Sequence, residues 1–86
     1  MASYSVSLVP SARKELRRLP KSDLVRAHEK IVHLGSSPRP HGVEILTDSE
    51  DVYRVRQGDY RIVYHVNDVT PQVTILRIRH RREAYR

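Results

Sequence analysis

The chain has 86 residues and a formal net charge of +6, with 16 Lys and Arg residues against 10 Asp and Glu. This length corresponds to one small domain, near the lower limit for a fold held by a hydrophobic core alone. The absence of cysteine excludes disulfides and thiolate metal sites, and no apolar run is long enough to span a membrane. The N-terminal segment does not have the pattern of a signal peptide, so we expect a cytoplasmic protein with no membrane partner.

Most of the basic excess is arginine, which binds phosphate through two parallel hydrogen bonds and can stack on a base. Composition alone leaves three interpretations open: a nucleic-acid partner, an acidic protein partner, and a basic surface without a polyanion partner.

The first half of the chain predicts a strand and two helices. Residues 4–9 alternate partially and indicate a strand, after which Ser11 is a reasonable N-cap for a helix over residues 12–19. A second helix is predicted over residues 22–34, with Gly35 as its C-terminal stop. Only a few residues separate the two helices, so they should pack as an antiparallel hairpin.

The strongest pattern in the second half is a β-hairpin. Val52–Gln57 and residues 60–66 alternate on either side of Gly58 and Asp59, and glycine accepts the positive φ of a two-residue turn. A short strand or irregular segment is expected before it, over residues 43–46, and a last strand after it, over residues 72–78. The order of elements predicts a single α+β domain over residues 1–86, in which an antiparallel meander sheet packs on the helical hairpin. The position of the N-terminal strand in the sheet is left open.

Alternation along these strands predicts one face rich in arginine. If the core receives Tyr53, Val55, Ile62 and Tyr64, and on the last strand Leu76 and Ile78, the opposite face carries Arg54, Arg56, Arg61, Arg77 and Arg79. Such a face is a plausible platform for a phosphate backbone.

The C-terminal segment extends this face. Arg81 and Tyr85 are expected at its rim, with Tyr60 as the tyrosine of the strands nearest to it. His80 shares the parity of the core residues, which favours a half-buried, hydrogen-bonded histidine over a catalytic one.

Several kinds of chemistry have no support in the sequence. It shows no metal-binding motif, no glycine-rich phosphate loop and no nucleophile elbow, so we expect neither a metal nor a cofactor. Metal-independent RNA cleavage fits an arginine cluster, because RNA supplies its own nucleophile in the 2′-hydroxyl group.

The chain resembles the RelE/ParE superfamily of bacterial toxins, and within it the RelE-type messenger-RNA interferases. Four segments carry the resemblance, occur in order and cover nearly the whole chain. They are Ala12-x-Lys14-x-Leu16-x-x-Leu19-Pro20, Pro38-x-Pro40-x-Gly42, Tyr53-Arg54-Val55-Arg56-x-Gly58-Asp59-Tyr60-Arg61-Ile62-Val63-Tyr64 and Ile75-Leu76-Arg77-Ile78-x-His80-Arg81-Arg82-Glu83-x-Tyr85.

The resemblance implies a microbial RNase-like fold and a type II toxin that cleaves messenger RNA in the ribosomal A site. It also implies contacts with ribosomal RNA, a cognate antitoxin that neutralises the toxin, and operator DNA bound only through the toxin–antitoxin complex. Two alternatives stay open: a ParE-like inhibitor of DNA gyrase without nuclease activity, and an inactive homologue that still binds antitoxin.

Roles for individual residues are also implied by the resemblance. Arg61 matches the arginine associated with the scissile phosphate, Arg81 matches an arginine proposed to assist the leaving group, and Tyr85 matches a tyrosine that stacks on or orients a nucleotide. Arg54 and Arg56 match basic positions that are often lysine. The segment after Gly42 departs from the family pattern, because it commonly carries lysines and here contains Glu44. An acidic residue is the general base in some relatives, so Glu44 is a candidate for that role, and the identity of the base is left open.

Overall fold

The computed structural model describes residues 3–46 and 50–82 of the chain. Its elements, in chain order, are β1 (Ser5–Leu8), α1 (Pro10–Arg17), α2 (Lys21–Ser36), β2 (Glu44–Ile45), β3 (Val52–Gln57), β4 (Tyr60–Asn67) and β5 (Gln72–His80). The strands form one sheet in the order β1-β5-β4-β3-β2, in which β1 is parallel to β5 and all other neighbours are antiparallel. The predicted α+β class and the antiparallel meander are confirmed, and β1 lies at an edge of the sheet.

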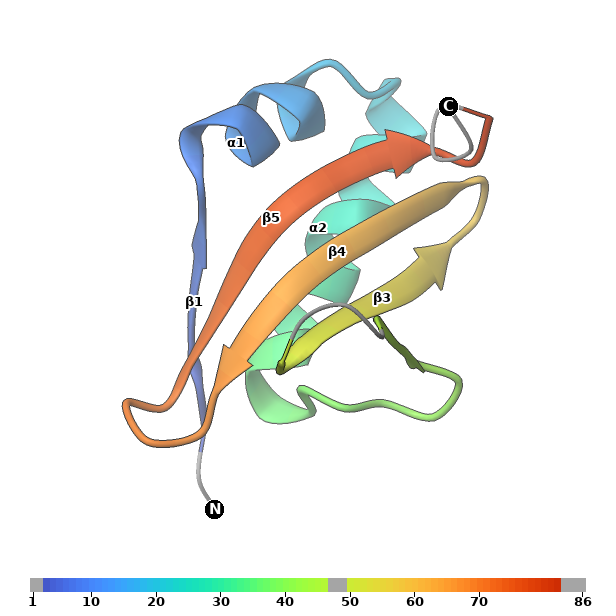
Figure 1. Cartoon of the computed structure of the whole chain (residues 1–86). Helices are drawn as coiled ribbons and strands as arrows, with labels where there is room; N and C mark the ends of the chain where they lie inside the picture. Colours follow the sequence, from blue (N-terminus) through green and yellow to red (C-terminus); the bar gives the residue numbers. More distant parts are fainter. Residues whose placement is uncertain (1–2, 47–49, 83–86) are drawn as a thin grey trace.

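The helices cover one face of this sheet, as Figure 1 shows with α2 behind the strands and α1 across the upper end of β1 and β5. The hydrophobic core lies between the two layers. It consists of Ala12, Ile31, Leu34, Tyr53, Val55, Ile62, Tyr64, Val66, Val73, Ile75 and Ile78. The opposite face carries no helix among the described elements, and we call it the open face.

The start of α1 differs from the prediction. The helix begins at Pro10 and its N-cap residue is Val9, so Ser11 lies inside the first turn instead of capping it. The reason is that proline fixes φ near the helical value and lacks the N–H that a first-turn residue leaves unpaired. Proline at this position therefore starts the helix earlier than a serine cap would.

The end of α2 also differs, because Gly35 does not stop the helix, which continues to Ser36. Gly35 is buried against the start of the chain, and its carbonyl oxygen accepts a 2.7 Å hydrogen bond from the N–H of Tyr4. A Cβ atom at this position would lie 3.0 Å from Val6 Cγ2 and 3.1 Å from the carbonyl oxygen of Tyr4. The glycine thus serves the close approach of α2 to β1.

A β-bulge between β4 and β5 corrects the expectation for Leu76. Val63 is opposite Arg77, but Tyr64 is opposite Ile75, so Leu76 is the extra residue of β5. Because the bulge inserts one residue into β5, the side chains before Leu76 alternate out of step with those after it. A core position is therefore odd-numbered before the bulge and even-numbered after it. Ile75 therefore occupies the core position that alternation had given to Leu76, and Ile75 is completely buried.

A polar cluster joins several segments at the end of the sheet farthest from the β3–β4 turn. It consists of Arg39, Asp68, Tyr53 and Tyr4, and we call it the Arg39 clamp. The guanidinium of Arg39 donates to both carboxylate oxygens of Asp68, at 3.1 and 2.8 Å, and its Nε donates to the hydroxyl of Tyr53 at 2.8 Å. Tyr4 donates its hydroxyl to Asp68 at 2.6 Å. The hydrogen bonds from Arg39 and then Tyr4 lower the pKa of Asp68 to about 2, since they stabilise its ionised form.

Candidate nucleic-acid interface

The open face carries two neighbouring rows of cross-strand arginines. Arg56, Arg61 and Arg79 are paired across β3, β4 and β5 in one row. Arg54 and Arg77 flank Val63 in the next row. Because directly paired residues project on the same face, all five arginines originate on the open face, as alternation predicted.

Four guanidinium-bearing residues line a cavity of about 360 Å³, which we call the arginine cavity. They are Arg56, Arg61, Arg81 and Arg82. Arg56 comes from the end of β3 and Arg61 from the start of β4, while Arg81 and Arg82 directly follow β5. The site prediction included the first three and omitted Arg82. Its position directly after Arg81 could have indicated it. Because β5 ends at His80, two consecutive side chains beyond that point need not lie on opposite faces.

The turn of the hairpin positions two of these arginines. Gly58, the first turn residue, has a φ of +62°, whereas Asp59 does not have a positive φ. This combination is that of a type II′ turn, which matches the twist of the strands. The carbonyl oxygen of Gly58 accepts a 3.1 Å hydrogen bond from Arg56 Nε, and that of Asp59 accepts a 2.8 Å bond from the N–H of Arg81. The Asp59 carboxylate also lies 3.8 Å from Arg81 Nε.

Arg54 and Glu44 form an ion pair beside the cavity, with 2.8 Å between Arg54 Nη2 and Glu44 Oε2. The two residues are cross-strand partners on β3 and β2. The Arg54 side chain is 28% exposed and that of Glu44 is 62% exposed. Glu44 therefore presents a solvent-facing carboxylate one cross-strand row away from Arg56 and Arg61.

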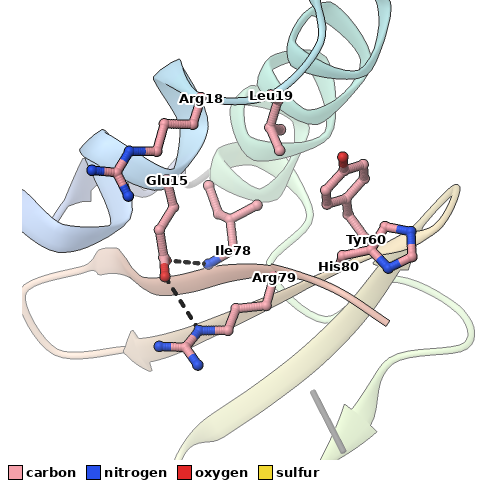
Figure 2. Close-up of a pocket in the computed structure, with 7 residues that line it drawn as sticks. All are labelled: Glu15, Arg18, Leu19, Tyr60, Ile78, Arg79 and His80. Atoms are coloured by element: carbon pink, nitrogen blue, oxygen red, sulfur yellow. Dashed lines mark hydrogen bonds and ion pairs between the residues drawn. The ribbon is translucent and has the colours of Figure 1, made fainter. Parts of the chain in front are cut away.

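Arg79 is directed elsewhere, although it starts in the same row as Arg61. Its Nε lies 3.3 Å from Glu15 Oε2, on helix α1. Glu15 and Arg79 belong to a second cavity of about 380 Å³, on the helix side of the sheet, which we call the Glu15 cavity (Figure 2). Its lining is Glu15, Arg18, Leu19, Tyr60, Ile78, Arg79 and His80.

His80 and Tyr60 form one wall of the Glu15 cavity. Their rings meet edge to face, with centroids 5.4 Å apart. His80 is half-buried and its Nδ1 accepts a 3.2 Å hydrogen bond from the N–H of Arg82. These contacts confirm the expected environment of His80, whereas Tyr60 faces this cavity and not the open rim. Tyr85 lies outside the described residues.

The arrangement is suited to binding an anion. In residues 3–46 and 50–82, no group of three or more His, Cys, Asp or Glu side chains could hold a metal ion. The helices of this part of the chain are all too short or too polar to cross a bilayer. Guanidinium groups that converge on one cavity bind phosphate oxygens through charge-assisted hydrogen bonds, and they stabilise charge that develops on phosphorus.

A comparison with protein families assigns this domain to a class. The model of the ParE toxin of the type II toxin–antitoxin system, parDE, matches residues 6–85. The chain therefore belongs to this family of type II toxin–antitoxin toxins, in agreement with the resemblance found in the sequence.

Several of the proteins to which the chain is similar are RelE toxins. Toxin RelE of Mycobacterium tuberculosis is 32% identical over 84 residues, which cover 96% of this chain and 87% of that protein. The archaeal RelE–RelB complex from Pyrococcus horikoshii contains a chain with 33% identity and a TM-score of 0.82, covering 92% of this chain and 96% of that one. The toxin–antitoxin complex RelBE2 from M. tuberculosis gives 30% identity and a TM-score of 0.81, with 93% of each chain covered.

Proposed function

We propose that this protein is the toxin of a type II toxin–antitoxin pair and acts as a ribosome-dependent, metal-independent endoribonuclease on messenger RNA in the ribosomal A site. The observation that carries the proposal is the arginine cavity, in which Arg56, Arg61, Arg81 and Arg82 converge at one end of the open face. Similarity to RelE toxins over nearly the whole chain supports it.

In the proposed reaction, the 2′-hydroxyl oxygen of RNA attacks the adjacent phosphorus and the bond to the 5′-oxygen of the next nucleotide breaks. The products are a 2′,3′-cyclic phosphate and a 5′-hydroxyl group, so the proton lost by the nucleophile is balanced by one gained by the leaving oxygen. Negative charge grows on the phosphorane oxygens and then on the leaving oxygen. Arg56 and Arg61 bind the phosphate, and Arg81 stabilises the charge on the leaving group.

The remaining predicted residues take supporting roles in this proposal. Arg54 and Arg77, in the next row of the open face, bind flanking phosphates, and Tyr85 stacks on or orients a nucleotide. Glu44 is the carboxylate that we assign to removal of the 2′-hydroxyl proton. Exchange of Glu44 for Gln keeps a hydrogen-bonding side chain beside Arg54 and removes the base, so cleavage should fall with little change in ribosome binding. Arg79 is not assigned to phosphate binding in this proposal, because its guanidinium is paired with Glu15.

The partner of the toxin is proposed by the same similarity. Two of the solved structures described above are complexes of a RelE toxin with its RelB antitoxin. We expect a cognate antitoxin to bind this chain in the cytoplasm and to block the arginine cavity. Operator DNA would then be bound through the antitoxin complex.

Primer extension on a defined message tests the proposal. Purified toxin is incubated with the message in the presence and absence of programmed ribosomes, with EDTA in the ribosome-free samples. New 5′ ends in register with codons, formed only with ribosomes, are the expected result. Cleavage of free RNA in EDTA would keep the nuclease and remove the dependence on ribosomes.

Inhibition of DNA gyrase is a second candidate function, favoured by the fact that the matching family model is that of the ParE toxin. This function requires a protein surface and no RNA cleavage. A supercoiling assay separates the two candidates. Loss of gyrase activity together with intact messenger RNA on ribosomes would replace the nuclease proposal by this one.

A further inference from the structure

The outer edge of β5 loses its neighbouring strand halfway along its length. β1 pairs with β5 only as far as Leu8 and Ile75, and the next residue, Val9, donates its N–H to the carbonyl oxygen of Ile75 at 3.0 Å. The chain then enters α1, while β5 continues to His80. Helix α1 lies beside this second half of β5 (Figure 1). A main-chain N–H at such an edge needs another acceptor if the helix covers it.

Glu15 of α1 supplies that acceptor. Its Oε1 accepts a 2.8 Å hydrogen bond from the N–H of Ile78, and its Oε2 lies 3.3 Å from Arg79 Nε (Figure 2). The Glu15 side chain is only 23% exposed, so water competes weakly for these contacts. One side chain thus binds the main chain and the side chain of two successive residues at the end of β5.

These contacts bear on the arginine cavity because of where β5 leads. Arg81 and Arg82, two of the four arginines that line the cavity, follow the strand directly. Fixing Ile78 and Arg79 fixes the direction in which the chain leaves the sheet. The carboxylate also balances the charge of Arg79, which is the cross-strand neighbour of Arg61 and would otherwise add a fifth cation beside the four arginines of the cavity.

We propose that Glu15 is a positioning residue for the arginine cavity: it anchors the end of β5 and holds Arg79 on the helix side, so that Arg81 and Arg82 meet Arg56 and Arg61 across the cavity. The expected effect on cleavage rests on the proposed function. The anchoring of β5 by Glu15 does not, and it can be measured on the toxin without ribosomes.

Three variants separate this role from general stability. Glu15→Ala removes both contacts. Glu15→Gln keeps an oxygen that accepts from Ile78 and removes only the charge opposite Arg79. Glu29→Gln is the matched control, since Glu29 is an exposed glutamate of α2 that lies outside both cavities. All are assayed well below their melting temperatures, with steady-state cleavage rates measured over a range of programmed-ribosome concentrations so that kcat and KM are obtained separately.

The expected kinetic result is a fall in kcat of about tenfold for Glu15→Ala, because Arg81 and Arg82 are then held less well against the reacting phosphate, with KM for the ribosome complex within about twofold. Glu15→Gln should recover most of the loss, and Glu29→Gln should equal the unmutated toxin. A folded Glu15→Ala variant with unchanged kcat, or an effect confined to KM, would overturn the proposal.

Amide hydrogen exchange on the toxin alone gives a second measurement. The N–H groups of Ile78 and Arg81 are hydrogen-bonded to Glu15 and to Asp59 respectively. Faster exchange at both positions in Glu15→Ala, with protection retained in Glu15→Gln, supports the anchoring role. Acceleration at Ile78 alone would overturn it, because the effect would not reach Arg81. If the unmutated toxin cleaves nothing, the proposed function fails, and the exchange at Arg81 decides the positioning role independently.

Discussion

The main-chain N–H of Arg81 donates a 2.8 Å hydrogen bond to the main-chain carbonyl oxygen of Asp59, which joins the end of β5 to the turn of the β3–β4 hairpin. The preceding turn carbonyl, that of Gly58, accepts from Arg56 Nε at 3.1 Å. Two successive carbonyl oxygens of one turn therefore orient arginines from both sides of the arginine cavity. The turn that makes the hairpin fold is also part of the site.

Substitution of Gly58 by alanine tests this dual role. Gly58 has a φ of +62°, which a residue with a Cβ atom adopts at a cost of about 1–2 kcal/mol. No atom lies within 4 Å of the added Cβ, so the strain is confined to the backbone. We expect Gly58→Ala to lower the free energy of unfolding by about 1 kcal/mol in urea titrations and to reduce cleavage as the turn shifts.

Gly42→Ala is the matched control for that variant. Gly42 also has a positive φ, of +87°, and open space around the added Cβ, but it lies in the connection before β2. Its loss of stability should be similar, with cleavage unchanged. Equal losses of cleavage in both variants would show that stability alone explains the effect at Gly58.

A second prediction concerns the contact between α2 and β1. Gly35→Ala gains about 1 kcal/mol of helix propensity but places a Cβ 3.0 Å from Val6 Cγ2 and 3.1 Å from a main-chain oxygen. Overpacking of this kind costs about 1–3 kcal/mol, and main-chain atoms cannot move aside as side-chain ends do. We expect a net destabilisation in urea titrations, whereas Val32→Ala, on the exposed side of α2, should change stability little. A more stable Gly35→Ala variant would contradict the role given to this glycine.

A third prediction follows from the pKa of Asp68, which the hydrogen bonds from Arg39 and Tyr4 lower from 3.8 to about 2. Because the folded state binds the proton less tightly than the unfolded state does, the clamp contributes its full stabilisation above the unfolded pKa of 3.8. That contribution is lost as the pH falls through about 2. The melting temperature of the unmutated protein should therefore exceed that of Asp68→Asn at pH 7, with the gap closing between pH 4 and pH 2. A gap that is constant with pH would contradict the prediction.

The hairpin and the open face could be predicted from sequence because both depend on local rules. A glycine between two alternating runs defines the turn, and the alternation itself puts Arg54, Arg56 and Arg61 on one face. The order of the elements also followed from local patterns along the chain, and the resemblance to RelE toxins added candidate roles for individual residues.

Other features depend on distant contacts that no local pattern contains. The bulge at Leu76 is set by the pairing of β4 with β5, so alternation along β5 alone gave the wrong core residue. Gly35 has the pattern of a helix stop in the sequence, and only the close approach of β1 in the structure explains why glycine is needed there. Sequence pattern alone suggests that Glu15 is a solvated charge on a basic helix. Its role becomes visible only in the structure, where β1 ends before Ile78 and the N–H of Ile78 donates to Glu15. The same holds for Arg39, whose partners Tyr53 and Asp68 come from two other segments of the chain.

The most direct test of the proposed function is the rate of codon-register cleavage on programmed ribosomes for Arg61→Ala beside Arg13→Ala. Both substitutions remove one arginine, but Arg13 is exposed on α1 and Arg61 lines the arginine cavity. Loss of one charged contact to the transition state costs about two to three decades in rate. The cleavage rate of Arg61→Ala should therefore fall by that amount, while the rate of Arg13→Ala stays within about threefold of that of the unmutated toxin. Equal rates for the two folded variants would remove Arg61 from the chemistry and contradict the proposed site.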